Sequence, residues 1–260
     1  MLEHTFIHIS GIGQKTEQRL WQREILTWEA FLTHGDKGLF SPARHAYVRR
    51  NIEASIENRD DIRFFQDRLS SAHMWRVFDR FRHRAIYLDI ETSGGGGNEE
   101  EITVIGLYDG FSVQTFVNGM NLKDFEPAVA RYDLVITFNG SQFDLPVIRR
   151  HFPHIALPPA HIDLRFLLKR LGYGGGLKAI EKRFGLARDG EIDGLNGYDA
   201  VMLWNAYTWG DQSALDRLIQ YNTADIVHLK PLMEKGYQET KARLLFPGPS
   251  PPPALGACRL

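Results

Sequence analysis

The sequence has a single cysteine, Cys258, among its 260 residues. One cysteine cannot form an intrachain disulfide, so we expect a protein of a reducing compartment, the cytoplasm. No apolar run approaches the roughly 18–20 residues that cross a bilayer, and the N-terminus lacks the apolar core of a signal peptide, so we expect no membrane partner. The formal net charge is only −1, which is too small to predict a nucleic-acid partner by itself.

A nucleotide-binding loop is also missing, although the chain has 24 glycines. The run from Gly94 to Gly97 is followed by acidic residues and an apolar segment. A phosphate-binding loop would instead continue through a lysine into a helix. We therefore predict that this glycine run is a hairpin loop between two strands.

The segment Ala85–Glu91 is the most informative part of the sequence. Its three aliphatic residues alternate with Tyr87, Asp89 and Glu91, which predicts a buried strand with both carboxylates on one face. Like charges side by side are unfavourable unless a cation lies between them, and hard divalent ions prefer oxygen ligands. The alternative is an edge strand with a solvated acidic end.

Further polar residues follow predicted elements downstream. Asp144 stands where an apolar strand, residues 133–138, gives way to a helix, a place that suits either a functional carboxylate or a helix N-cap. Tyr221 and Asp225 are four residues apart in a helical stretch that begins near Tyr198, so their side chains share one face. The remaining predictions are strands over 102–108 and 112–117, helices over 121–131, 163–171 and 177–184, and an irregular connection over 153–162.

The N-terminal part, residues 1–83, is predicted to be helical. Gly11-Ile12-Gly13 leads into a helix and resembles the second half of a helix-hairpin-helix motif, which would let Gly11, Gly13 and Lys15 contact a phosphate backbone. The alternative is a glycine turn between packed elements. Residues 42–83 read as helical and amphipathic. The arginines within this stretch and directly after it face either a polyanion or solvent: Arg49, Arg50, Arg80, Arg82 and Arg84.

Three motifs occur in order along the chain: Asp89-x-Glu91, Asn139-x-x-x-Phe143-Asp144 and Tyr221-x-x-x-Asp225. Over residues 84–240 the chain resembles the DEDD exonucleases, in particular the tyrosine subtype and the YprB-like ribonuclease-H-like group. Gln220 stands where the histidine subtype would have its histidine. The resemblance implies an α/β fold: a ribonuclease-H-like mixed five-stranded sheet flanked by helices, with an N-terminal helical appendage. We expect residues 84–245 to form the exonuclease domain and the proline-rich residues 246–260 to be a disordered tail.

The resemblance also implies a function: a metal-dependent 3′→5′ exonuclease that releases nucleoside monophosphates from DNA or RNA, with the single-stranded 3′ end as substrate. Two Mg²⁺ or Mn²⁺ ions would be held by Asp89, Glu91, Asp144 and Asp225, with Asp89 shared between them and Asp144 acting largely through water. Tyr221 would position the attacking water. The resemblance assigns substrate contacts to Thr92, Asn139 and Phe143, and the basic helix places Lys178 beside the substrate. Two alternatives are a non-catalytic nucleic-acid-binding scaffold and an endonuclease on the same fold.

Overall fold

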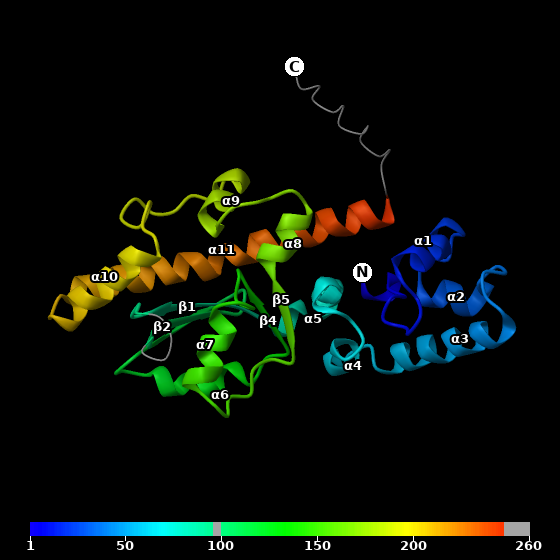
Figure 1. The fold of residues 1–260 in the computed structure, drawn as a ribbon, viewed down its shortest axis with the longest axis horizontal. Coiled ribbons are helices and arrows are strands. Elements are labelled where there is room, and N and C mark those ends of the chain that lie inside the picture. Colours follow the sequence, from blue (N-terminus) through cyan, green and yellow to red (C-terminus); the bar gives the residue numbers. More distant parts are fainter. Residues whose placement is uncertain (96–99, 247–260) are drawn as a thin grey trace, which may run out of the picture.

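A five-stranded mixed sheet lies at the centre of the computed structural model, which describes residues 1–95 and 100–246 (Figure 1). The strand order is β3-β2-β1-β4-β5, in which β1, β2 and β3 are antiparallel and β1, β4 and β5 are parallel. The strands are β1 Ala85–Thr92, β2 Ile102–Tyr108, β3 Val113–Val117, β4 Leu134–Thr137 and β5 Ala160–Asp163. The predicted mixed five-stranded sheet is confirmed. The antiparallel pairing of β1 with β2 also confirms the predicted hairpin. Residues 96–99 of its loop lie outside the described residues.

The strand β5 corrects the sequence prediction, which placed 160–162 in an irregular connection. It is only four residues long, alternates Ala160 and Ile162 with His161 and Asp163, and directly follows two prolines. So short an alternation after Pro158-Pro159 gives little periodic signal. Pairing with β4, rather than local propensity, makes it a strand.

Alternation along β1 divides the core between the two faces of the sheet. The aliphatic residues of β1 pack against α6 (Phe125–Val129) and α7 (Asp144–His151) on one face. The opposite face, which carries Tyr87, is covered by α8 (Leu164–Arg170) and the long helix α11 (Gln212–Leu245). Figure 1 shows α11 running across the sheet above β1 and β2. The two remaining helices on this side are α9 Leu177–Phe184 and α10 Gly197–Thr208.

Local signals explain where the last two helices begin. Asn196 and Asp199 form a capping box at the start of α10. Asp211 caps α11 by accepting hydrogen bonds from the backbone N–H groups of Ser213 and Ala214 at 3.0 and 3.3 Å. Gly210, with φ of 105°, breaks the chain between the two helices. The predicted helical stretch is therefore confirmed as two helices.

The N-terminal part is helical as predicted, and residues 42–83 are divided among several helices. Asp61 caps a new helix by accepting a hydrogen bond from the N–H of Arg63 at 3.0 Å, and Asn58 donates to the carbonyl of Ala54 at 2.8 Å. Such side-chain bonds compete with helix propagation. The elements are η1 Leu2–His4, α1 Gln14–Gln22, α2 Trp28–His34, α3 Pro42–Glu57, α4 Ile62–Gln66, η2 Ser71–Val77, α5 Phe78–Phe81 and η3 Arg82–Arg84.

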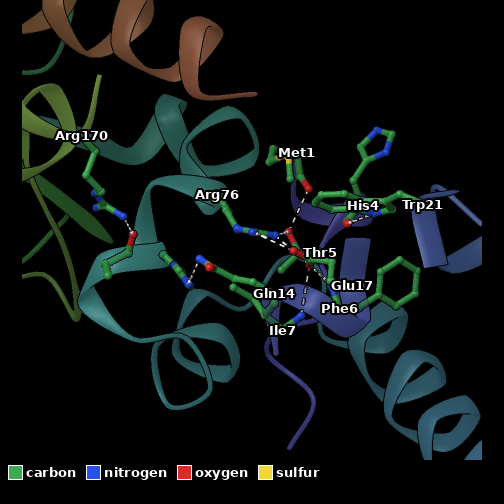
Figure 2. A network of polar contacts seen from close by, with 12 residues as sticks. Met1, His4, Thr5, Phe6, Ile7, Gln14, Glu17, Trp21, Arg76 and Arg170 are labelled. Carbon is green, nitrogen blue, oxygen red and sulfur yellow. Dashed lines mark hydrogen bonds and ion pairs between the residues drawn. The ribbon is translucent and has the colours of Figure 1, made fainter. Parts of the chain in front are cut away.

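A buried ion pair links the elements of the N-terminal part. Arg76 donates from Nη1 and Nη2 to the two carboxylate oxygens of Glu17 at 2.9 and 2.8 Å (Figure 2). Glu17 also accepts hydrogen bonds from the backbone N–H groups of Phe6 and Ile7 at 2.7 and 3.2 Å. One carboxylate thus ties η2 to α1 and to the segment before it.

One hydrophobic cluster runs from Phe6 through Trp75 to Leu168 on α8 and Tyr237 on α11, and so crosses residue 84. The predicted domain division at 84 stays a prediction, and the predicted disordered tail beyond Phe246 lies outside the described residues. Three of the surface arginines form ion pairs with nearby carboxylates, as expected of a solvated helix face: Arg49 with Glu53, Arg80 with Asp60 and Arg84 with Asp133. Among the described residues, no helix combines the length and the apolar character that crossing a membrane requires.

Candidate active site

Three carboxylates converge on the α11 face of the sheet. Asp89 and Glu91 extend from β1, Asp225 extends from α11, and one oxygen from each lies within 4.8 Å of the other two. Glu91 and Asp225 are 7% and 6% exposed. Strand alternation places the first two side by side, as predicted, and the packing of α11 on β1 adds the third.

This arrangement is electrostatically unfavourable without a cation. Burial raises the pKa of Asp89 well above its ordinary value, and the neighbouring charges of Asp144, Asp225 and Glu91 raise it further. Burial followed by Asp225 and Asp144 raises the pKa of Glu91 in the same way. Buried carboxylates that raise one another's pKa are typical of a functional site that binds a cation.

Asp144 lies outside this compact group but close to it. The ladder between β1 and β4 ends at the pair Tyr87 and Ile136, so the N–H of Ile90 needs another acceptor. The carboxylate of Asp144 provides it, with Oδ1 3.1 Å from that nitrogen. Burial raises the pKa of Asp144 to about 7. Asp144 is the first residue of α7, and the N-cap is Phe143. The Asp144 side chain therefore accepts a hydrogen bond from β1 and does not cap the helix.

Asn222 is a site residue that the sequence analysis missed. Its Nδ2 donates to the carbonyl and to Oδ2 of Asp89 at 3.3 and 3.1 Å. Asn222 reaches Asp89 past Gly106 of β2, where a Cβ would lie 2.1 Å from the amide oxygen Oδ1. This contact depends on how α11 crosses the sheet, and no spacing in the sequence signals it.

Tyr221 and Lys178 form a second contact in the site. Lys178 Nζ donates to the Tyr221 hydroxyl at 2.7 Å and also to the carbonyl of Leu195. Burial and the nearby charge of Asp225 raise the pKa of Tyr221 above its ordinary value of 10, so the hydroxyl stays protonated at neutral pH. Lys178, predicted from the basic helix as a substrate contact, is thus held against Tyr221.

Arg188 is the second residue that the sequence analysis missed. Its Nη2 donates to Asp225 Oδ1, and the same nitrogen donates to Glu181 Oε1 at 2.7 Å. Its Nε donates to Glu181 Oε2 at 2.8 Å, and Glu181 is held in turn by His228 of α11 at 3.0 Å. Arg188 follows α9 in a segment without regular secondary structure, where no periodicity marks it.

The predicted substrate contacts lie around the carboxylates but outside the compact group. Thr92 Oγ1 donates to Glu100 Oε1 at 2.8 Å. Asn139 has φ of 69°, and its N–H donates to Asp163 Oδ1 at 2.9 Å. Phe143 is 38% exposed beside Asp144. Their contact with a substrate stays a prediction.

The N-terminal glycine turn forms as predicted and leads into α1. Gly11 has φ of 76°, Gly13 is the N-cap, and Lys15 is exposed in the first turn. Within the described residues the short 3-10 helix η1 is the only helix before it, so the first α-helix of a helix-hairpin-helix motif does not form. Arg44 lies against the turn and donates to the carbonyl of Ser10 at 2.6 Å. Phosphate binding by this turn stays a prediction.

Comparisons with known proteins concern the part of the chain that holds the sheet and the site. A family model described as RNase_H superfamily matches residues 86–237, more than half of the 260 residues. No curated protein matches the sequence.

Three solved structures resemble the fold. A family B DNA polymerase from the archaeon Pyrobaculum calidifontis has a TM-score of 0.48 and 16% identity over 58% of this chain and 24% of that one. Escherichia coli RNase D, an exoribonuclease, has a TM-score of 0.47 and 21% identity over 68% of this chain and 44% of that one. Brucella melitensis NrnC bound to pGG has a TM-score of 0.45 and 20% identity over 64% of this chain and 79% of that one. The chain therefore spans less than half the length of the first two proteins.

Proposed function

Since the chain belongs to the RNase_H superfamily, we propose that it is a metal-dependent 3′→5′ exonuclease that hydrolyses phosphodiester bonds in DNA or RNA. The observation that carries the proposal is the convergence of Asp89, Glu91 and Asp225 within 4.8 Å of one another. The resemblance of the three motifs to the tyrosine subtype of DEDD exonucleases implies the direction of the reaction and the release of nucleoside monophosphates.

The donor set fits Mg²⁺ or Mn²⁺, because all three groups offer carboxylate oxygens, which hard divalent cations prefer. Asp89, Glu91 and Asp225 would hold one ion, and Asp144 would support a second one beside Asp89. When bound, two such ions supply an activated water and stabilise the leaving oxygen of the cleaved bond. The raised pKa values of Asp89 and Glu91 are consistent with a site whose negative charge is balanced by cations.

Tyr221 would position the attacking water. Its pKa is raised above 10, so the hydroxyl is a hydrogen-bond donor and acceptor at neutral pH and is not a general base. Lys178 fixes the orientation of this hydroxyl, because its ammonium group donates to the oxygen from 2.7 Å. The hydroxyl proton is therefore free to point toward a water or a phosphate oxygen.

Two further residues would orient the carboxylates. Asn222 holds Asp89 by two hydrogen bonds, and Arg188 holds Asp225 while Glu181 fixes the guanidinium on two sides. Both are positioning residues, because they act on the carboxylates. The carboxylates of Asp89 and Asp225 are thus held in fixed orientations before any cation arrives.

The test uses single-stranded oligonucleotides of DNA and of RNA, labelled at either the 5′ or the 3′ end, with Mg²⁺ or Mn²⁺. We expect the 5′-labelled strand to shorten one nucleotide at a time and the 3′-labelled strand to release a labelled mononucleotide at once. Chelation of the metal or Asp89→Asn should abolish both.

Other outcomes would overturn the proposal. Cleavage of circular single strands would indicate an endonuclease, because an exonuclease needs a free end. Tight binding of the strand without any product would indicate a non-catalytic scaffold.

A further inference from the structure

A groove of about 640 Å³ lies between the N-terminal part and the sheet domain. One wall is η2, which contributes Ala72 and Trp75, and the other wall is formed by β5 and α8. This volume lies in the range of ~300–1,000 Å³ that is typical of small-molecule and nucleotide sites. The groove exists only because the N-terminal part packs against the sheet domain.

The groove begins at the loop that carries the second motif. Ser141, within the loop that leads from β4 to Asp144, lines the groove together with Asp163 at the end of β5. Asp163 holds this loop by accepting hydrogen bonds from Asn139 N–H at 2.9 Å and from Ser141 N–H and Oγ at 3.1 and 2.5 Å. The loop therefore connects the groove, which it lines through Ser141, to Asp144 beside the carboxylate group.

The lining chemistry fits a single-stranded polyanion. Phe166 is 42% exposed and lines the groove with Lys169 and Arg170. The one carboxylate in the lining, Asp163, is occupied by the three hydrogen bonds of the loop. Proteins that bind single strands commonly combine an aromatic ring, on which a base stacks, with cations that face the phosphates.

The N-terminal part continues this surface. Arg170 Nη1 donates to the carbonyl of Ala72 at 2.6 Å, and the next residue, His73, contacts Gln14 at 3.2 Å between their side-chain nitrogens (Figure 2). Gln14 is the first residue of α1, directly after the glycine turn. These contacts link the groove wall at Ala72 to the first residue of α1, directly after the glycine turn.

We propose that this groove binds the single-stranded nucleotides that lie 5′ of the one being removed, with a base against Phe166 and phosphates facing Lys169 and Arg170. The proposal rests on the proposed exonuclease activity and adds a substrate path to it. It gives the N-terminal part a role in holding the strand between cleavage steps. An apolar peptide would also fit Trp75 and Phe166, but the two cations and the continuity with the second motif favour the nucleic acid.

The experiment compares short and long substrates. The double variant Phe166→Ala with Lys169→Gln removes the ring and one cation and keeps Arg170, which supports η2. The control, Phe111→Ala with Lys123→Gln, likewise removes one exposed aromatic ring and one exposed cation, but both lie outside the groove. We expect the groove variant to raise KM for a 12-mer about 10-fold, since stacking of one base is worth on the order of this factor. It should leave kcat and the cleavage of a dinucleotide unchanged.

A binding measurement separates this proposal from the proposed function. Fluorescence anisotropy with a 5′-labelled 12-mer is measured on three proteins that all carry Asp89→Asn to prevent cleavage. They are the protein without further changes, the groove variant and the control variant. We expect the groove variant to weaken the Kd about 10-fold and the control variant to leave it unchanged. Equal Kd and KM values for groove variant and wild type would overturn the groove proposal. Absence of cleavage of every substrate would overturn the exonuclease, while the anisotropy would still decide whether the groove holds the strand.

Discussion

In the described part of the chain two arginines are buried against carboxylates, and their surroundings differ. Arg76 and Glu17 are each 1% exposed and form an ion pair with one another. The Glu17 carboxylate also accepts hydrogen bonds from two backbone N–H groups. Arg188 is 4% exposed and faces two carboxylates, Glu181 and Asp225. The second of these carboxylates belongs to the compact group with Asp89 and Glu91.

The difference lies in the charge balance. At the Arg76 pair one cation meets one anion, so the charges cancel and the pair fixes the packing of η2 on α1. Around Arg188 the carboxylates outnumber the cations, so negative charge remains that a divalent ion can neutralise. A balanced buried pair thus indicates a structural role, whereas an excess of buried carboxylates indicates a binding site.

The largest effect should come from removing a carboxylate from the unbalanced cluster. We expect Asp89→Asn to lower kcat by about 10³-fold or more, because it removes the ligand that two metal ions would share, an interaction worth several kcal/mol. The measurement is single-turnover cleavage of a 5′-labelled oligonucleotide. Asp124→Asn changes an exposed carboxylate in the short 3-10 helix η5 (Leu122–Asp124), and this matched control should keep wild-type activity. Retention of more than a tenth of the activity by Asp89→Asn would contradict the assignment.

The two arginines can then be compared directly. We expect Arg76→Met to lower the free energy of unfolding by about 3–5 kcal/mol, because it leaves the buried charge of Glu17 unpaired. Added Mg²⁺ should not restore this loss. Arg188→Met should also lower the free energy of unfolding, but here Mg²⁺ should recover part of the loss, because the ion can neutralise Asp225. Chemical denaturation with and without Mg²⁺ measures both.

Arg49→Met is the control for these two variants, because the ion pair of Arg49 with Glu53 is exposed. It should change the free energy of unfolding by less than about 1 kcal/mol. An equal response of the Arg76 and Arg188 variants to Mg²⁺ would remove the distinction between a structural and a functional pair.

A smaller effect is expected at Tyr221. Tyr221→Phe removes the hydroxyl that Lys178 holds and leaves the carboxylates in place. We expect kcat to fall about 10²-fold with KM nearly unchanged, in the range typical of removing one positioned hydrogen-bond donor. An unchanged kcat would show that this hydroxyl takes no part in the reaction.

The smallest effect concerns pH and the metal-free protein. Because burial raises the pKa of Asp144 to about 7, its neutral form is favoured in the folded state. Asp144 therefore adds to the free energy of unfolding at acidic pH, and this contribution is lost as the pH rises through about 7. We therefore expect the metal-free protein to have a lower Tm at pH 8 than at pH 6. Asp144→Asn should reduce this difference and raise the free energy of unfolding at pH 8 by about 1–2 kcal/mol. A Tm that rises from pH 6 to pH 8 would contradict the sign.

Features that depend on local pattern could be predicted from the sequence. Alternation placed Asp89 and Glu91 on one face of a strand, four-residue spacing placed Tyr221 and Asp225 on one face of a helix, and the resemblance of the motifs joined them. The family match and the observed sheet confirm the ribonuclease-H-like fold.

Features that depend on tertiary packing could not be predicted. Asn222 reaches Asp89 only because Gly106 lets α11 approach β2 closely. Arg188 reaches Asp225 from an irregular segment, and β5 exists because it pairs with β4. The groove beside Phe166 is formed by two parts of the chain that are about 90 residues apart in sequence. No local pattern encodes such contacts.

Diffraction from crystals grown with Mn²⁺, recorded at the manganese absorption edge, tests whether the buried carboxylates bind a divalent cation. We expect strong anomalous density between the carboxylates of Asp89, Glu91 and Asp225, with a second peak roughly 3.5–4 Å away toward Asp144 when substrate is bound. Anomalous density elsewhere, or none at these carboxylates at millimolar Mn²⁺, would contradict this expectation.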